Sequence, residues 1–383
     1  MAKAANRTNW WFALHGWMAL PVWLFLFFVC LTGTLATVDR EIMWLADSAV
    51  RAPAAEGRER QPLNRLVAGL REQVAGAHVN YIRFGEPYMA LEVFISTPDR
   101  PSAVAWVDPF SGQVRQVATG IGLAGFIRAL HGWLLMPFQN GTPLGWYAVC
   151  LMGLPLLGSV VTGLVVYKRF WRAWTAPRLR LDRGRRVAWG DFHRLAAVWS
   201  LWFIVVIALT GLWFLVRGVL YDLHIPVGVD EMELARHEAP LRRPGAPLPA
   251  IDLDQALAAV QAGRPGTVPL FLSPPEHALG TIEIYSRDAF PLLMEKAWVN
   301  PYSGAVLARR NVGNAGALEI ISALNASLHY GNFAGLAVKL VWMAFGLLLT
   351  ALVLSGTVVW TLRTARATRA VVAAAVLATG GAR

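Results

Sequence analysis

The sequence carries little charge and almost no cysteine. Of its 383 residues, 15% are charged and 56% are hydrophobic. Soluble domains carry about 25% charged residues, so this composition excludes an ordinary soluble fold. The only cysteines, Cys30 and Cys150, lie inside apolar runs. No disulfide therefore holds the polar loops, and a thiolate-bound iron–sulfur cluster is excluded.

Long apolar runs dominate what is present. A helix needs about 20 apolar residues to cross the hydrocarbon core of a bilayer, and four runs meet that length. We expect the first run to be retained rather than cleaved, because it is rich in Trp and Phe and no small-residue cleavage site follows it. The predicted membrane-spanning runs are roughly Trp10–Val38, Gly145–Tyr167, Phe192–Val216 and Phe333–Thr361.

The net charge of +11 is concentrated near the ends of these runs. The positive-inside rule places such basic segments in the cytoplasm, which predicts a multi-pass protein of a bacterial inner membrane with both termini cytoplasmic. A nucleic-acid patch is the alternative, but a position between two spans favours topology and contact with anionic membrane lipid, with no nucleic acid as partner. The basic residues between the second and third runs are Lys168, Arg169, Arg172, Arg178, Arg180, Arg183, Arg185, Arg186 and Arg194.

Short motifs recur in the two halves of the chain. Leu31-Thr32-Gly33 in the first run matches Leu209-Thr210-Gly211 in the third, and Thr162-Gly163 in the second matches Ser355-Gly356 in the fourth. An Asp-Pro-Phe-Ser-Gly turn at 108–112 matches Asn-Pro-Tyr-Ser-Gly at 300–304. We interpret the chain as a parallel internal duplication, in which each half is a span, an external segment and a span.

The two external segments show the same pattern, a helix followed by short strands. Together they predict a small α+β periplasmic domain built from two segments, although caps that only protect the span ends are an alternative. A proline-rich stretch, Pro240–Pro249, leads into the second segment. The expected helices are Leu63–Val74 and Leu253–Val260, and the expected strands are Val79–Phe84, Tyr88–Ser96, Ala103–Val107, Val268–Leu272, Thr281–Tyr285 and Leu293–Val299.

These observations divide the chain into eight parts: 1–38, first span; 39–125, first periplasmic segment; 126–167, interfacial helix and second span; 168–191, cytoplasmic basic loop; 192–216, third span; 217–315, second periplasmic segment; 316–361, interfacial helix and fourth span; 362–383, cytoplasmic tail. The predicted fold class is an α-helical membrane protein with four transmembrane helices from a parallel internal duplication and a small external α+β domain.

Four of the eight histidines occupy matching places at the span ends. His15 and His193 lie at the cytoplasmic ends of the first and third runs, and His131 and His329 lie just outside the second and fourth. A histidine beside hydrocarbon is costly unless it faces a cavity, a partner or a metal. His224 is either a further ligand at the outer site or an interfacial polar residue. We interpret the remaining ones, His78, His237 and His277, as ordinary surface residues.

A single such histidine would be an interfacial anchor, but equivalent places in both halves favour two axial-ligand pairs. A structural zinc site requires four protein ligands, whereas two imidazoles without nearby carboxylates or thiolates suit a metal whose other ligands come from a macrocycle. No Cys-x-x-Cys-His motif is present, so covalent c-type attachment is excluded. The prediction is two b-type haems, one held by His15 and His193 and one by His131 and His329, in an electron-transfer protein.

Neighbouring residues are assigned supporting roles. Gly16, Gly132 and Gly331 are expected to allow close approach of the ring. We expect the haem propionates to pair with basic residues near the histidines, namely Arg128, Arg194 and Lys339. No catalytic side chain is assigned, and the oligomeric state is open between monomer and homodimer.

The chain resembles the PepSY-associated transmembrane family, and within it the siderophore reductases of the bacterial inner membrane. The resemblance rests on the Leu-His-Gly-Trp segments at His15 and His131, the Thr-Gly and Ser-Gly span motifs and the paired Pro-Phe/Tyr-Ser-Gly turns. It implies a di-haem enzyme with a PepSY-like external domain that reduces ferric siderophore in the periplasm. No Gly-rich dinucleotide fingerprint is present, so we expect electrons from a separate cytoplasmic reductase or from quinol.

Three other functions are alternatives. PepSY-like segments would also suit a non-redox membrane protein that binds a peptide or a peptidase. An internal repeat of spans would suit an iron or siderophore transporter. The same haems would also serve a different acceptor, such as another periplasmic metal or an oxidised thiol.

Overall fold

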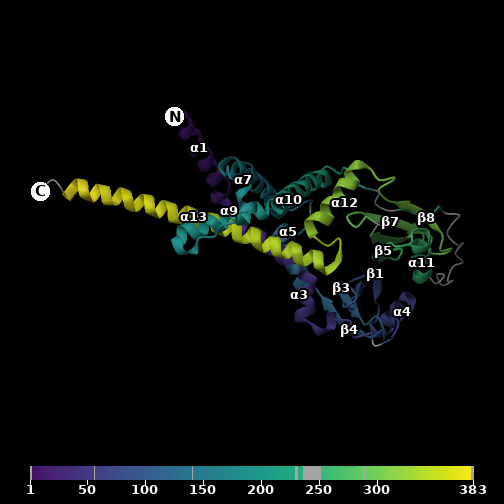
Figure 1. The fold of residues 1–383 in the computed structure, drawn as a ribbon. Helices are drawn as coiled ribbons and strands as arrows, with labels where there is room; N and C mark the ends of the chain where they lie inside the picture. The colour runs from purple at the N-terminus through teal and green to yellow at the C-terminus, as the bar shows by residue number, and fades with distance from the viewer. Residues whose placement is uncertain are drawn as a thin grey trace.

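The computed structural model describes residues 2–55, 57–139, 141–228, 232–235, 252–287 and 290–380. It contains a helical bundle and, at one end of it, an antiparallel sheet (Figure 1). Four helical segments are long and apolar enough to cross a membrane: Trp10–Thr37, Leu144–Val166, Leu201–Asp222 and Gly335–Arg366. The prediction of a membrane protein with four spans and a separate α+β part is therefore confirmed. His237 and the stretch 240–249 lie outside the described residues.

Three of the predicted spans are interrupted or preceded by breaks. The first comprises α1 (Ala2–Ala19), a 3₁₀ turn (Leu20–Val22) and α2 (Trp23–Thr37), and the break falls at Pro21, which lacks a backbone donor. The second comprises α6 (Leu144–Leu151) and α7 (Gly153–Val166). The third, α10 (Leu201–Asp222), begins later than expected, because the chain breaks at Ser200 after α9 (Arg185–Trp199). His193 consequently lies on α9 and not on the span itself.

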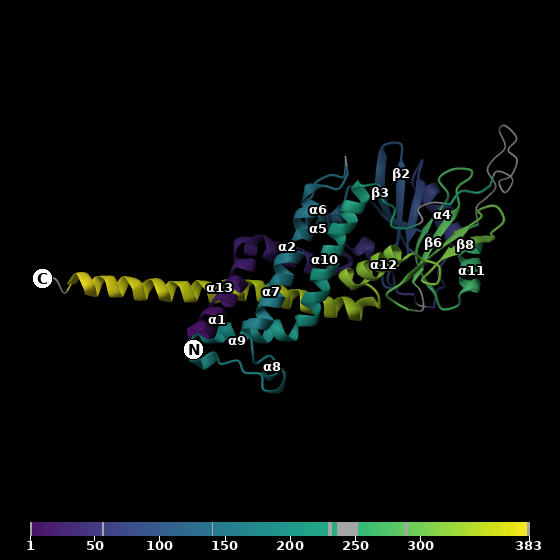
Figure 2. The same cartoon turned by 90° about the horizontal axis from the view of Figure 1, so that it is seen from above.

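The fourth span belongs to a long helix, α13 (Gly335–Gly380), which runs past the bundle away from the sheet (Figure 2). Two amphipathic helices precede the second and fourth spans: α5 (Gly122–Trp133) packs on α2, and α12 (Ala317–Tyr330) packs on α10. A short helix, α3 (Asp39–Ala46), follows α2 and packs on α5. We call the end of the bundle that carries residues 167–199 the basic end, and the opposite end the sheet end.

Strands from both external segments join in one eight-stranded sheet with the order β4-β3-β2-β1-β5-β6-β7-β8. The segments meet where β1 pairs antiparallel with β5, with Ile82 opposite Leu272. Each side of this join is a meander of consecutive strands. The strands are β1 (His78–Arg83), β2 (Leu91–Thr97), β3 (Arg100–Val107), β4 (Val114–Thr119), β5 (Val268–Ser273), β6 (Ile282–Arg287), β7 (Met294–Val299) and β8 (Val306–Arg310).

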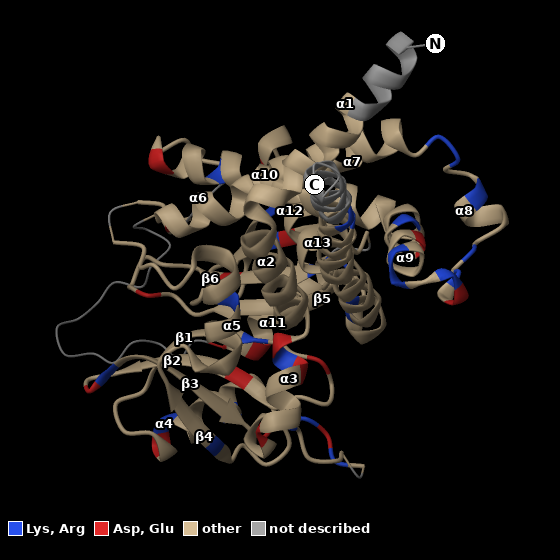
Figure 3. Cartoon of the chain, turned by 90° about the vertical axis from the view of Figure 1, so that its left-hand side faces the viewer, with Lys and Arg blue, Asp and Glu red and all other residues tan. Residues whose placement is uncertain are grey.

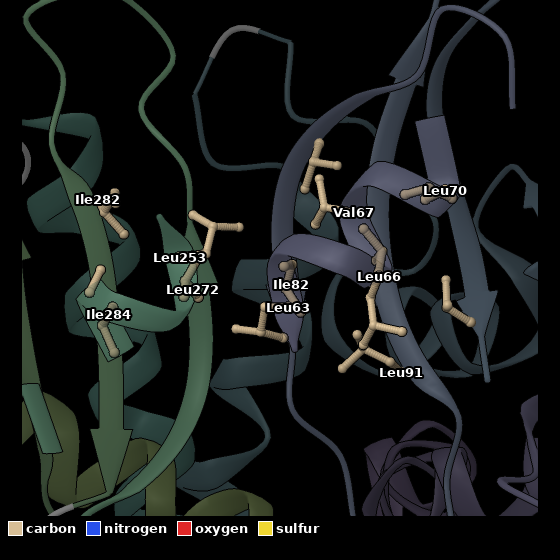
Figure 4. Close-up of a cluster of buried hydrophobic side chains, with 14 of the residues drawn as sticks. Leu63, Leu66, Val67, Leu70, Ile82, Leu91, Leu253, Leu272, Ile282 and Ile284 are labelled. Carbon is tan, nitrogen blue, oxygen red and sulfur yellow. The ribbon is translucent and has the colours of Figure 1, made fainter. Parts of the chain in front are cut away.

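Two amphipathic helices, α4 (Leu63–Gln73) and α11 (Leu253–Gly263), cover one face of this sheet and bury a continuous apolar core with it (Figure 4). Leu70, Ile82 and Leu272 are completely buried in this core. Each helix also caps the other. The Asp254 carboxylate accepts hydrogen bonds from the backbone N–H groups of Leu63 (2.7 Å) and Asn64 (2.9 Å), and the Asn64 side chain accepts one from Leu253 N–H (3.0 Å).

The mutual capping gives a first prediction. Pro62 precedes α4 and has no side-chain acceptor. Asp254 on α11, in the second external segment, therefore supplies the cap. We expect Asp254→Ala to destabilise the start of α4 by about 1 kcal/mol, the usual effect of losing a helix cap. Hydrogen–deuterium exchange of the full chain should show faster exchange at residues 63–67. Glu59→Ala, at an exposed position nearby, is the matched control; equal exchange in both variants would contradict the capping role.

Candidate functional site

At the basic end, the structure brings His15 of α1 and His193 of α9 together. Their ring centroids are 6.4 Å apart, and the ring planes make an angle of 75°. Both rings are partly buried among apolar side chains. Although 178 residues separate them in the sequence, the two imidazoles face each other across the bundle, as the repeat pattern predicted.

At the sheet end, His131 of α5 and His329 of α12 form a second pair. Their ring centroids are 6.2 Å apart and the ring planes are closer to parallel, at 26°. The side chain of Phe214 packs edge-on against His329, with a centroid separation of 5.1 Å. The structure thus contains two imidazole pairs of nearly equal spacing, one toward each end of the four spans.

Every paired histidine has a hydroxyl partner on a different helix. At the basic end, Nδ1 of His15 lies 2.9 Å from Thr162 Oγ1 on α7, and Nδ1 of His193 lies 3.0 Å from Ser355 Oγ on α13. These contacts tie α1 to α7 and α9 to α13.

The sheet end repeats this arrangement. Nδ1 of His329 lies 2.8 Å from Thr210 Oγ1 on α10, and Nδ1 of His131 lies 3.4 Å from Thr32 Oγ1 on α2. The four hydroxyls belong to the Thr-Gly and Ser-Gly pairs noted in the sequence. Sequence reasoning used those pairs as repeat markers and missed their contact with the histidines, although one such pair in each span was the available signal.

The glycine of three of these pairs lets an imidazole approach the helix backbone. A Cβ atom on Gly33 would lie 2.6 Å from Cε1 of His131, and one on Gly356 would lie 3.1 Å from Cε1 of His193. Gly163 stands in the same relation to His15, at 3.3 Å. Gly211 differs, since a Cβ there would meet no atom within 4 Å.

The glycines next to the histidines in sequence do not lie against an imidazole. Gly132 faces open space, and the nearest contact of a Cβ on Gly16 is Leu20 at 3.6 Å. Gly331 instead ends α12 with a positive φ of 62°. The imidazoles themselves approach glycines on facing helices, and the expected approach of a haem ring at Gly16, Gly132 and Gly331 stays a prediction.

The predicted propionate partners at the sheet end are already paired with carboxylates. Arg128 Nε lies 3.1 Å from Asp39 Oδ2, and Lys339 Nζ lies 2.7 Å from Glu41 Oε1. Burial raises the pKa of Asp39, and the Arg128 guanidinium counteracts part of that rise. The Arg128 side chain is 42% exposed, and no further ion pair occupies it within the described residues.

At the basic end, Arg194 forms an ion pair with Asp191 one turn before it on α9. Arg180 from the preceding loop donates to the same carboxylate at 2.8 Å through Nε. These hydrogen bonds lower the pKa of Asp191 to about 2, so the carboxylate is charged at any physiological pH. Both arginines therefore help to fix α9, the helix that carries His193.

Buried ion pairs also join the sheet to the bundle. Glu92 on β2 pairs with Arg40 of α3 at 3.3 Å and with Arg83 of β1 at 3.1 Å. The Glu92 side chain is only 8% exposed. The sheet is thus bound to the helix that directly follows α2, close to the sheet-end histidines.

A cleft of about 660 Å³ lies between the second half of the sheet, the end of α10 and α12. His224 lines this cleft and does not contact the His131–His329 pair, so the alternative that it is an interfacial polar residue fits the structure better than ligation. The cleft wall includes Ala326, one turn before His329 on α12. Basic side chains from three elements also line it: Arg217, Lys296 and Arg310.

Among the described residues, no group of three or more His, Cys, Asp or Glu side chains is arranged to hold a metal ion. Each imidazole pair therefore offers two protein ligands. Two metal–nitrogen bonds of about 2 Å, together with the inner parts of two imidazole rings, span roughly 6 Å, which is close to the centroid separation of each pair.

Comparison with known proteins supports the membrane architecture. The family model described as the PepSY-associated TM region matches residues 12–363. An uncharacterized protein of Pseudomonas aeruginosa is 29% identical over 256 residues, which is 62% of this chain and 63% of that protein. The matched region thus spans less than two thirds of that relative's length.

Proposed function

The chain belongs to the PepSY-associated transmembrane family, and we propose that it is a di-haem oxidoreductase that reduces ferric siderophore iron on the outer side of a bacterial inner membrane. One observation carries this proposal: two imidazole pairs with centroid separations of 6.4 and 6.2 Å, one toward each end of the spans. We also propose that the recurring motifs reflect an internal duplication and that the sheet is a PepSY-like domain.

The donor set supports b-type haem at both pairs. Each pair supplies two neutral nitrogen ligands, and the described residues offer no third protein ligand. A porphyrin would complete such a site with its own nitrogens, and its iron would supply reversible one-electron transfer. His15 and His193 would hold one group, and His131 and His329 the other. The exposed Arg128 and Arg194 guanidinium groups are the proposed partners of the propionates.

Charge supports the orientation. Lys and Arg gather on the segments around α8 (Arg172–Thr175) and α9, at the basic end (Figure 3). By the positive-inside rule this end lies in the cytoplasm and the sheet lies outside. Each span exposes a large apolar side chain of the kind that contacts lipid: Leu24, Leu154, Leu209 and Leu347.

This orientation defines the direction of electron transfer. A quinol or a cytoplasmic reductase would give up electrons at the basic end, and each Fe(III) ion at the sheet end would take up one. The cleft beside α12 is the proposed place for the ferric chelate, because its wall reaches Ala326, one turn from His329. Reduction would release iron because Fe(II), a softer and less charged ion, binds oxygen donors more weakly than Fe(III).

Haem content tests the pairing. We expect His15→Ala and His329→Ala each to lower the bound haem by about half, because each removes one axial ligand of one pair. A reduced-minus-oxidised difference spectrum with a haem-to-protein ratio measures this. His224→Ala, outside both pairs, should keep the full ratio. Full retention in both test variants, or a colourless wild-type protein from haem-replete cells, would contradict the proposal; the latter would favour the peptide-binding alternative.

The glycines provide a second test with a built-in control. We expect Gly33→Ala to lower haem occupancy at the sheet-end pair, because the new methyl group would lie 2.6 Å from Cε1 of His131. Gly211→Ala changes the equivalent motif on α10, where a Cβ meets nothing within 4 Å, and should keep its haem. The same haem-to-protein ratio is measured for both. Equal ratios would show that the close approach at Gly33 does not matter for the site.

Vesicles test the direction and the acceptor. With the purified protein inserted sheet-end outward, a reductant enclosed inside and a ferric hydroxamate chelate outside, we expect Fe(II) to appear outside, where a colorimetric Fe(II) chelator detects it. The His329→Ala protein should slow this reaction at least tenfold. Uptake of labelled iron by vesicles without reductant would instead support the transporter alternative.

A further inference from the structure

Each of the four hydroxyls that face a histidine also faces its own helix. Thr162 Oγ1 donates to the carbonyl of Gly158 at 2.7 Å, and Thr210 Oγ1 donates to that of Val206 at 2.7 Å. Thr32 and Ser355 do the same with Phe28 and Leu352, each at 2.8 Å. A carbonyl oxygen can only accept, so the single hydrogen of each hydroxyl is committed to the backbone.

The direction of this hydrogen bond affects which nitrogen of the imidazole carries the proton. A hydroxyl that donates its hydrogen to the backbone presents only lone pairs to the ring, which favours the tautomer with the proton on the facing Nδ1. The opposite nitrogen, Nε2, then keeps its lone pair.

We infer that these four hydroxyls, from Thr32, Thr162, Thr210 and Ser355, are positioning residues that hold each histidine as the Nδ1–H tautomer and fix the plane of its ring. This inference rests on the proposed function, since it assigns Nε2 as the iron ligand. The hydrogen bond at Nδ1 makes a bound imidazole a stronger electron donor, which stabilises Fe(III) and lowers the reduction potential.

The two histidine pairs differ in the angle between their ring planes, and the positions of the hydroxyls account for this difference. The hydroxyls at the basic end come from α7 and α13 and hold the rings 75° apart, whereas those at the sheet end come from α2 and α10 and hold them 26° apart. The ring-plane angle of two axial imidazoles affects the electron paramagnetic resonance spectrum of low-spin ferric haem. The two sites should therefore give two distinguishable signals.

The test replaces a hydroxyl by a methyl group of the same size. In Thr210→Val we expect the haem held by His329 to shift to a higher midpoint potential and to change its resonance signal, while the signal of the other haem stays the same. Thr210→Ser keeps the hydroxyl and should restore both values. Thr350→Val is the matched control, because Thr350 on α13 is buried and bonds to the carbonyl of Gly346 without touching a histidine.

A second measurement does not need haem. In the haem-free protein with ¹⁵N-labelled histidine, nuclear magnetic resonance should show protonated Nδ1 and unprotonated Nε2 at the four histidines, and Thr210→Val should turn His329 into a mixture of tautomers. If Thr210→Val does not fold, Ser355→Ala, with Ser355→Thr as its rescue, gives the same comparison at His193.

The outcomes separate the two proposals. Unchanged potential, resonance signal and tautomer in the Val and Ala variants would overturn the positioning role while leaving the haem proposal intact. A wild-type protein that binds no haem would overturn the proposed function, and the tautomer measurement would still decide whether the hydroxyls act on the rings.

Discussion

Each imidazole inside the apolar helical bundle needs a hydrogen-bonding partner, and the structure depends on these partners. An imidazole between membrane helices loses its water, and leaving a ring nitrogen unbonded there is costly. Each paired histidine has Nδ1 within hydrogen-bond distance of a hydroxyl that also bonds to its own helix, so the contact costs the helix none of its backbone hydrogen bonds. Each of these contacts also joins two helices: α1 to α7, α9 to α13, α5 to α2 and α12 to α10. The same four contacts therefore hold the helices together and position the histidines.

The dipeptide Thr-Gly or Ser-Gly provides both a hydroxyl that faces the imidazole and a glycine beside it. Its hydroxyl faces Nδ1 of a histidine, and in three of the four motifs its glycine leaves room for the ring beside the backbone. A larger residue at Gly33 or Gly356 would push the imidazole away from its hydroxyl. The motif on α10 departs from this pattern, since Gly211 touches nothing, and there Phe214 packs against His329 instead. The sheet-end pair is thus asymmetric, with one ring held against a backbone and the other against an aromatic side chain.

The elements that the sequence predicted are those marked by hydrophobic periodicity or by repetition. Long apolar runs predicted the four spans, helical spacing predicted α4 and α11, and equivalent positions predicted which histidines meet. It did not predict β4 and β8, the edge strands, because none of their side chains is fully buried and they carry little apolar alternation. The break at Ser200 was also missed, since no proline or glycine marks it. The hydroxyl partners of the histidines were missed because the Thr-Gly and Ser-Gly pairs mark a repeat without indicating which distant side chain each hydroxyl faces.

Charged side chains hold the sheet against the helical bundle near the sheet-end histidines. Glu92 is buried where α3 meets the sheet, between the partly buried Arg40 and Arg83, and removing both arginines would leave its charge uncompensated. Lys339, at the start of the fourth span, pairs with Glu41 on the same short helix. One helix, α3, therefore connects the first span, the fourth span and the sheet. Helix α2 ends directly before α3 and carries Thr32, the hydroxyl residue that faces His131. The contact to the sheet and the contact to His131 therefore lie on one continuous stretch of chain. The position of the sheet relative to the sheet-end pair follows from this covalent connection as well as from packing.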